Sequence, residues 1–158
     1  MMRRLSLLAA CLAATLLVGA PAFADCVPSE FPDGWLLEQE HKGGHTVDRH
    51  VSKSEAWLID RLKRDRKIPA ASSFPDRVTA RQVIGLALAP DENDLDEWAR
   101  TARAGEVAEI RMAFEQPIGR IVVRGKAVGE PAFGLRLFVR ALGDGNCFLL
   151  TAYPTHGG

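Results

Sequence analysis

The period of the hydrophobic pattern changes once along this chain, at Gly105, and that change constrains the fold more than any other feature. Before Gly105, apolar residues recur every three or four positions, which places them on one face of a helix. After Gly105, apolar and polar residues alternate, which is the pattern of a half-buried strand. N-terminal helices followed by strands predict an α+β domain with an antiparallel β-sheet.

A capping box marks the first expected helix. In this motif a serine hydroxyl and a glutamate three residues later satisfy each other's free backbone N–H groups. The segment Ser52–Glu55 has this form, so we expect a helix from there to about Lys67, burying Leu58, Ile59 and Leu62. Residues 25–40 contain two prolines and predict an irregular lead-in that packs at its end.

Two more helices are expected before Gly105. A second capping box at Thr79–Gln82 predicts a helix that Pro90 ends. A third helix is expected over residues 94–104, with Gly105 closing its C-terminus. The core-facing positions of these two helices are Ala80, Val83, Ile84, Ala87, Leu88, Leu95, Trp98, Ala99 and Ala102.

Strands are expected at residues 107–115, 120–124, 134–142 and 147–153. In the first of them, Ala108, Ile110, Met112 and Phe114 occupy alternate positions, so they predict the buried face. The segment Gly143–Asn146 is rich in turn-forming residues and predicts the turn into the last strand.

Residues 1–24 have the layout of a secretory signal peptide. Arg3 and Arg4 supply positive charge, an apolar stretch follows, and Ala22–Ala24 has the small-x-small form of a cleavage site. The apolar stretch is shorter than the roughly 20 residues that a spanning helix needs. We expect cleavage near Ala24 and a secreted or periplasmic protein without stable membrane association. The alternative is a lipoprotein box ending at Cys11, although cleavage there would leave an apolar tail.

The charge of the remaining chain limits how it could bind nucleic acid. The whole chain has a formal net charge of zero, and loss of Arg3 and Arg4 leaves residues 25–158 two units negative. Proteins that coat long nucleic acids carry a strong basic excess, so that class is excluded. We divide the chain into a signal peptide (1–24), the lead-in (25–40) and one domain (41–158).

Cys26 and Cys147 are the cysteines left after removal of the signal. An even pair in an exported protein suggests a disulfide. Closing so long a loop would stabilise the fold by up to about 5 kcal/mol in the chain-entropy model. The alternative is two unrelated thiols.

The chain has four histidines, at positions 41, 45, 50 and 156. His41 and His45 have the i, i+4 spacing of a zinc-binding helix. Gly43 and Gly44 lie between them and oppose a helix, and no glutamate stands where a metalloprotease needs its base. We therefore expect no metal ion and no cofactor.

Several segments occur in an order that resembles a known family. They are Gly43–Ser54 (GGHTVDRHVSKS), the helical residues Leu58, Asp60, Arg61 and Leu62, the segment Ser72–Phe74 and the final Leu150–Pro154 (LTAYP). Together they are similar to the bacterial ribonuclease A-like toxin domain found at the C-terminal ends of contact-dependent inhibition and other polymorphic toxins. The resemblance spans residues 43–154, with Ser52 standing where glycine is common in the family.

This resemblance implies a two-lobed, kidney-shaped ribonuclease A-like fold and metal-independent RNA cleavage. Carried onto matching positions, it implies a site of His50, Arg61, Thr151 and Tyr153. His45, in the Gly-Gly-His-Thr segment, is a further candidate.

Cleavage by attack of the 2′-hydroxyl needs a base, a stabiliser of phosphorane charge and a proton for the leaving oxygen. Histidine titrates near working pH, so we assign His50 as the general base. The guanidinium of Arg61 would hold the phosphate bidentately, and Thr151 would donate a hydrogen bond to it. Tyr153 would protonate the leaving oxygen. An alternative is an acid and base pair of His45 and His50.

The spacing of His50 and Arg61 requires a break in the chain. On one continuous helix their α-carbons would lie about 16 Å apart, too far for both to touch one phosphate. The capping box at Ser52 predicts that break. Thr151 and Tyr153 share a face of the last strand, which Pro154 is expected to end.

A dense basic run lies on the first predicted helix, at Arg61, Lys63, Arg64, Arg66 and Lys67. One interpretation is a solvated face balanced by Asp60 and Asp65. The other is a local patch that binds RNA and weakens as salt rises. The two can coexist, and we expect Lys53, Lys63 and Arg64 to contact RNA.

The leading hypothesis is an exported, monomeric endoribonuclease that cleaves RNA without metal, with a role as an antibacterial toxin and a cognate immunity protein as partner. One alternative is a catalytically silent secreted domain that binds a protein on the same scaffold. The other is a metal-dependent nuclease, which would lose activity on chelation.

Overall fold

The computed structural model describes residues 26–28 and 30–157, so the predicted signal peptide and its cleavage site lie outside the described residues. In chain order the elements are α1 (Trp35–His41), α2 (Thr46–His50), α3 (Glu55–Arg64), β1 (Ala70–Ser73), α4 (Arg77–Leu88), a 3₁₀ turn (Ala89–Asp91), α5 (Glu92–Thr101), β2 (Val107–Ala113), β3 (Gly119–Val123), β4 (Glu130–Ala132), β5 (Gly134–Ala141) and β6 (Cys147–Thr155). Among these described residues, no helix is long and apolar enough to cross a membrane.

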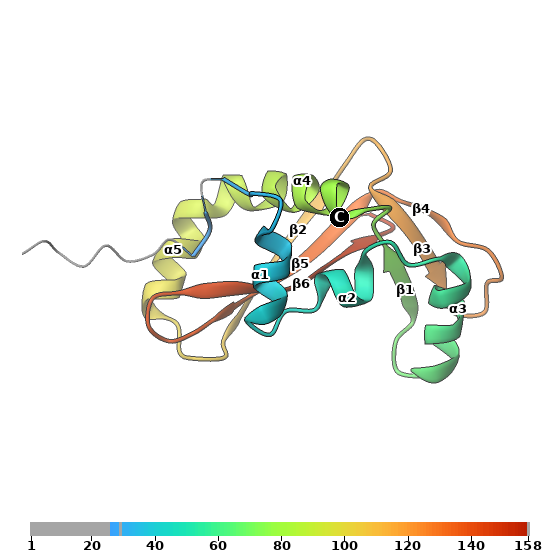
Figure 1. Ribbon diagram of the computed structural model, residues 1–158, viewed down its shortest axis with the longest axis horizontal. Coiled ribbons are helices and arrows are strands. Elements are labelled where there is room, and N and C mark those ends of the chain that lie inside the picture. The colour runs from blue at the N-terminus through green and yellow to red at the C-terminus, as the bar shows by residue number, and fades with distance from the viewer. Residues whose placement is uncertain (1–25, 29, 158) are drawn as a thin grey trace, which may run out of the picture.

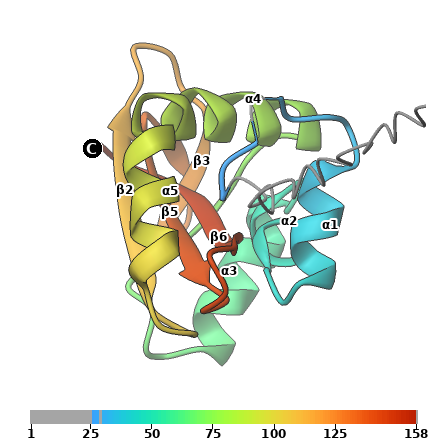
Figure 2. The ribbon, with the colours of Figure 1, turned by 90° about the vertical axis from the view of Figure 1, so that its left-hand side faces the viewer.

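The strands form two antiparallel sheets, in the orders β1-β3-β4 and β2-β5-β6. The β2-β5-β6 sheet, with α1, α2, α4 and α5, makes a large lobe, and the β1-β3-β4 sheet, with α3, makes a small lobe (Figure 1). Turning the molecule by 90° shows α5 running beside the β2 and β5 strands, with α4 across the top (Figure 2). The predicted α+β class with a two-lobed arrangement is confirmed.

The core of the large lobe lies between the helices and one face of the β2-β5-β6 sheet. The predicted stripe of α4 is buried, and it belongs to the same cluster as Leu135, Leu137 and Val139 of β5. Ile110 of β2 is buried in this cluster, and the other predicted core residues of that strand pack against it. The period-two pattern therefore identified the inner face of the sheet correctly.

The small lobe has a much smaller core, made of Leu58, Leu62, Ala71 and Val122. Leu58 and Leu62 are buried as predicted, while Ile59 is partly buried against the cluster. Polar contacts supplement this core. The guanidinium of Arg124 donates hydrogen bonds of 2.6–3.2 Å to the backbone carbonyls of Leu62, Asp65 and Ile68.

The predicted caps were wrong at two helices. Helix α3 begins at Glu55 with Ser54 as its N-cap, whose hydroxyl accepts from the Trp57 N–H at 3.2 Å, and it ends at Arg64 instead of Lys67. Helix α4 begins at Arg77 because Asp76 accepts from the Thr79 N–H at 2.7 Å. In both cases a nearby side chain of equal capping strength was available, and the sequence motif alone could not rank the two.

Two further expectations needed correction around the helices. Helix α5 ends at Thr101, and Gly105 does not cap it, because the Gly105 N–H donates to the Ala141 carbonyl at 2.9 Å. Gly105 therefore belongs to the entry into β2. The lead-in is not irregular throughout: its second half forms α1, which buries Trp35 and Leu36 in the large-lobe core.

The strand prediction missed β1 and β4 and misplaced the end of β6. β1 consists of small residues without alternation, and only its pairing with β3 makes it a strand. β6 continues through Pro154 to Thr155. Proline is tolerated there because β6 is an edge strand of its sheet, where a missing N–H removes no ladder bond.

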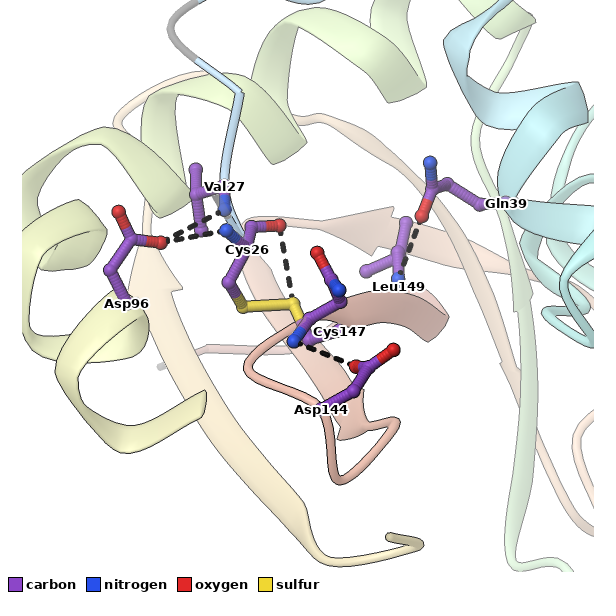
Figure 3. Close-up of a disulfide and its surroundings, with 8 residues drawn as sticks. Cys26, Val27, Gln39, Asp96, Asp144, Cys147 and Leu149 are labelled. Atoms are coloured by element: carbon purple, nitrogen blue, oxygen red, sulfur yellow. Dashed lines mark hydrogen bonds between the residues drawn. A yellow bond between two sulfur atoms is a disulfide. The ribbon is translucent and has the colours of Figure 1, made fainter. Parts of the chain in front are cut away.

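The predicted disulfide joins Cys26 to Cys147, whose α-carbons lie 4.9 Å apart. Figure 3 shows this bond tying the start of the described chain to the start of β6. The carboxylate of Asp96 on α5 accepts from the N–H of Cys26 at 2.8 Å and from that of Val27 at 3.3 Å. The N-terminal segment is thus held to both β6 and α5.

Candidate active site

A cleft of about 370 Å³ lies between the two lobes. All five residues predicted for catalysis line it: His45, His50, Arg61, Thr151 and Tyr153. The remaining lining residues are Ile68, Pro69, Ala70, Ser72, Ile121, Arg136, Pro154 and Thr155. Residues about a hundred positions apart in the chain therefore meet around one space.

The chain breaks between His50 and Arg61, as predicted, but not because of a cap at Ser52. His50 ends α2, and Ser52 takes the left-handed backbone conformation with φ of 55°, which reverses the chain before α3. This conformation favours glycine, the residue common here in the family that the sequence resembles. The Ser52 hydroxyl donates to the Pro75 carbonyl at 3.2 Å, and Arg61 Nη1 donates to the Arg49 carbonyl at 3.2 Å.

His50 is buried at the junction of the lobes, with 7% of its surface exposed. Its Nδ1 lies 3.0 Å from the carbonyl oxygen of Ser72 on β1. A carbonyl oxygen only accepts, so Nδ1 carries the proton and Nε2 keeps its lone pair. Burial lowers the pKa of His50 to about 3; the hydrogen bond to Ser72 opposes this shift, and the charge of Arg61 adds to it. The imidazole is therefore neutral at physiological pH.

The last strand places the Tyr153 ring beside His50 and Thr151 in the same cleft. The rings of His50 and Tyr153 have centroids 5.2 Å apart and are tilted by 31°. Thr151 is buried, and its Oγ1 has no hydrogen-bond partner within the described residues. A buried hydroxyl without a partner is costly, so a polar ligand atom in the cleft would satisfy it. The Ala152 N–H donates to Thr46 Oγ1 at 2.9 Å, which fixes α2 against β6.

His45 lies at the start of α2, where its backbone N–H donates to the Leu150 carbonyl of β6 at 3.0 Å. Its side chain lines the cleft beside His50. Burial lowers the pKa of the His45 imidazole below its usual value, and the charges of Arg49 and Arg61 act in the same direction. Two histidines in this cleft therefore favour their neutral forms.

Two contributors to the site were not predicted. Arg136 of β5 lines the cleft because the β5-β6 register places it opposite Tyr153. An arginine on a strand has no local signature that distinguishes a site residue from a solvated one. Ser72 was part of a recognised segment, but the use of its carbonyl to orient His50 depends on the packing of β1 against α2.

The three residues predicted to contact RNA do not line the cleft. Lys53 Nζ lies 5.2 Å from the centre of the Trp57 ring, and Arg64 pairs with Asp60 at 3.0 Å on the exposed face of α3. Lys63 is exposed on the same helix. The solvated-face interpretation describes Arg64, while RNA contact by these residues stays a prediction. Within the described ranges, no group of three or more His, Cys, Asp or Glu side chains could hold a metal ion.

Comparisons with known proteins agree with this architecture. The family model described as the bacterial CdiA-CT RNAse A domain matches residues 44–154. One chain of the crystal structure of the CdiA-CT/CdiI complex from Y. kristensenii 33638 is 32% identical, with a TM-score of 0.61, and the match covers 71% of this chain and 99% of that chain. A comparison with curated proteins gives no match. Because the family match includes every predicted catalytic residue and most of the sequence, the chain belongs to the bacterial CdiA-CT RNase A domain family.

Proposed function

We propose that this protein is an exported, metal-independent endoribonuclease that cleaves RNA by attack of a ribose 2′-hydroxyl on the adjacent phosphate. The observation that carries the proposal is the neutral imidazole of His50, whose Nε2 is available in the same cleft as Arg61, Thr151 and Tyr153. Membership of an RNase A domain family supports RNA as the substrate.

His50 acts as the general base in this mechanism. Its Nε2 accepts the proton of the 2′-hydroxyl while the 2′-oxygen forms a bond to phosphorus. A pKa of about 3 keeps the imidazole unprotonated before substrate binds. The negative charge of a bound phosphate opposes the effect of Arg61, so the imidazole becomes more basic as the proton is transferred.

Arg61 and Thr151 stabilise the negative charge that develops on the non-bridging phosphate oxygens. The Arg61 guanidinium pairs with two non-bridging oxygens, and Thr151 Oγ1 donates to one of them. The Tyr153 hydroxyl gives its proton to the 5′-oxygen as the bond from phosphorus to that oxygen breaks. We prefer Tyr153 to His45 as the acid because burial disfavours the protonated form of His45.

Replacement of His50 tests this mechanism. In buffer containing EDTA, His50→Ala should cleave RNA about 10²–10⁴-fold more slowly than the wild type, because the positioned base is lost. His156→Ala is the matched control, since His156 is exposed and does not line the cleft. Cleavage by His50→Ala at the wild-type rate would contradict the site, and loss of wild-type activity in EDTA would contradict metal independence.

Arg61→Ala tests whether catalysis depends on the Arg61 guanidinium itself or only on the positive charge of α3. The variant should lose about 10²–10³-fold in kcat, since a donor to the developing charge is removed. Arg64→Ala is the control one turn further along, where the side chain pairs with Asp60 in solvent. Equal losses in the two variants would show that the basic helix acts only through general charge.

We also propose a cognate immunity protein in the producing cell and a role as an antibacterial toxin. The similar CdiA-CT chain is part of a complex with CdiI, which supports a partner of this kind. Purification of this protein with the product of a neighbouring reading frame would test the partner, and N-terminal sequencing of the exported protein would test cleavage near Ala24. Elution as a monomer in size-exclusion chromatography is expected for the free enzyme.

A further inference from the structure

The β2-β5-β6 sheet has a second face, which points away from the large-lobe core. Side chains alternate along β5, so Arg136, Phe138 and Arg140 lie on the face opposite buried Leu135, Leu137 and Val139. The β2-β5 register places Glu109 opposite Phe138 and Arg111 opposite Arg136. We call this set the β5 platform; it consists of Glu109, Arg111, Arg136, Phe138 and Arg140.

The β5 platform carries excess positive charge with free hydrogen-bond donors. Glu109 Oε1 accepts from Arg111 Nε at 2.7 Å and from Arg136 Nε at 2.6 Å. One carboxylate thus orients two guanidiniums by their Nε groups. Across residues 26–28 and 30–157 no hydrogen bond involves the Nη groups of either arginine, and the buried Nε of Arg140 also has no partner. The Nη groups of Arg111 and Arg136 are suited to the oxygens of a phosphodiester, whereas the buried Nε of Arg140 is out of reach of a ligand.

The aromatic residue Phe138 lies between Arg136 and Arg140 on this face of β5. Phe138 is half-buried, its ring stacks with Tyr153 at a centroid distance of 6.2 Å, and the guanidinium of Arg136 lies 5.3 Å from its centre. Tyr153 in turn contacts His50, and Arg136 lines the cleft. The platform therefore adjoins the cleft through Arg136, which lines the cleft, and through Phe138, which stacks with Tyr153.

We propose that the β5 platform binds the nucleotide next to the scissile phosphate of single-stranded RNA. The base stacks against Phe138, and the neighbouring phosphate is held by the free Nη groups of Arg136 and Arg111. Single-stranded RNA fits because an unpaired base can offer its face to an aromatic ring, whereas a paired base is stacked within its helix. The inference rests on the proposed ribonuclease function, whose site it extends.

Binding of an RNA that cannot be cleaved tests the platform separately from catalysis. The probe is a fluorescein-labelled 2′-O-methyl hexanucleotide, which lacks the attacking hydroxyl, and fluorescence anisotropy gives Kd for the full protein. Phe138→Ala should weaken binding roughly 5- to 150-fold, the range found for loss of one base stack. Phe138→Trp should retain tight binding because it keeps a stacking surface.

Arg136→Gln should weaken binding and reduce the dependence of log K on log salt by about 0.7, the contribution of one phosphate contact on a single strand. Arg100→Gln is the matched control, since Arg100 is exposed on α5, outside the cleft and the platform. Wild-type affinity in both Phe138→Ala and Arg136→Gln would overturn the proposal. So would variants that bind the oligonucleotide normally but lose a protein partner, because the platform would then be a protein interface.

Failure of the platform proposal can be distinguished from failure of the proposed catalytic mechanism. If the wild type cleaves RNA and His50→Ala does not, but Phe138→Ala binds normally, the platform is wrong and the ribonuclease proposal stands. If the probe binds in a Phe138-dependent way and RNA is not cleaved, the platform is upheld and the catalytic proposal fails.

Discussion

The two lobes are stabilised by different kinds of interaction. The large lobe buries an extended apolar cluster from three helices and three strands, and a disulfide closes it at the start of β6. The small lobe buries only Leu58, Leu62, Ala71 and Val122, and relies on Arg124 to bind the carbonyls that follow α3. Buried area governs the hydrophobic contribution to stability, so the large lobe has much the greater share.

This difference matters because the cleft needs both lobes. The large lobe supplies Thr151 and Tyr153 on a strand that core packing and the disulfide hold, while the small lobe supplies Arg61. His50 joins the two, since it ends α2 of the large lobe and its Nδ1 bonds to Ser72 of β1. A phosphate in the cleft would therefore bridge a strongly packed lobe and a weakly packed one.

Loss of the disulfide should have the largest effect on the large lobe. Replacing both Cys26 and Cys147 by serine should lower the free energy of unfolding by about 5 kcal/mol, because the unfolded chain regains the freedom of a long loop. Urea unfolding measures this, and dithiothreitol should bring the wild type to the same midpoint. An unchanged midpoint in the double variant would show that packing alone holds β6.

The junction should respond to pH. The folded pKa of His50 is about 3 and the unfolded value is about 6.5, so the unfolded chain binds the proton first as pH falls. His50 therefore contributes its full stabilisation above pH 6.5, and that contribution declines between pH 6.5 and 3 by about 5 kcal/mol.

The difference in unfolding free energy between the wild type and His50→Gln, measured by urea from pH 7.5 to 4, isolates this contribution. The wild type should lose more stability than the variant on acidification. His156→Gln, altered at an exposed position, is the control and should follow the wild type. Parallel pH profiles for the wild type and His50→Gln would mean that the junction is open to water.

The small lobe should depend on Arg124. Arg124→Ala leaves the carbonyls of Leu62, Asp65 and Ile68 without this donor, at a cost of about 1–3 kcal/mol. Trp57 packs against the small core and reports on that lobe, so its fluorescence should change at lower urea than the far-UV signal of the whole protein. Arg100→Ala is the control. If the Trp57 fluorescence and the far-UV signal of Arg124→Ala change at the same urea concentration, the two lobes unfold as one unit.

The parts of the fold that follow from local pattern were predicted well. The stripe of α4 and the alternation in β2 depend only on spacing along the chain, and both faces are buried as expected. The N-cap of α3 was misplaced because Ser52 and Ser54 are chemically equal candidates, and the left-handed conformation of Ser52 decides between them. β1 was missed because its strand conformation comes from a partner some fifty residues away.

The candidate site also contains residues that the sequence predicted and one that it did not. The residue types that resemble an RNase A-like domain could be identified from the chain, and His45, His50, Arg61, Thr151 and Tyr153 all line one cleft. The position of Arg136 in the lining of the cleft could not be predicted, because it depends on the register between β5 and β6. Register is a relation between distant segments and leaves no local trace in an alternating strand.

The amino-acid sequence by itself determined the helix and strand faces, the two cysteines available for pairing and the kinds of side chain that carry the chemistry. Only the tertiary structure decided that Ser72 fixes the proton on Nδ1 of His50, that burial keeps this imidazole neutral and that Glu109 aims two arginines along β5. The physical reason is that periodicity and capping act over a few residues, whereas burial, tautomer and charge pairing depend on atoms that only the folded chain brings together.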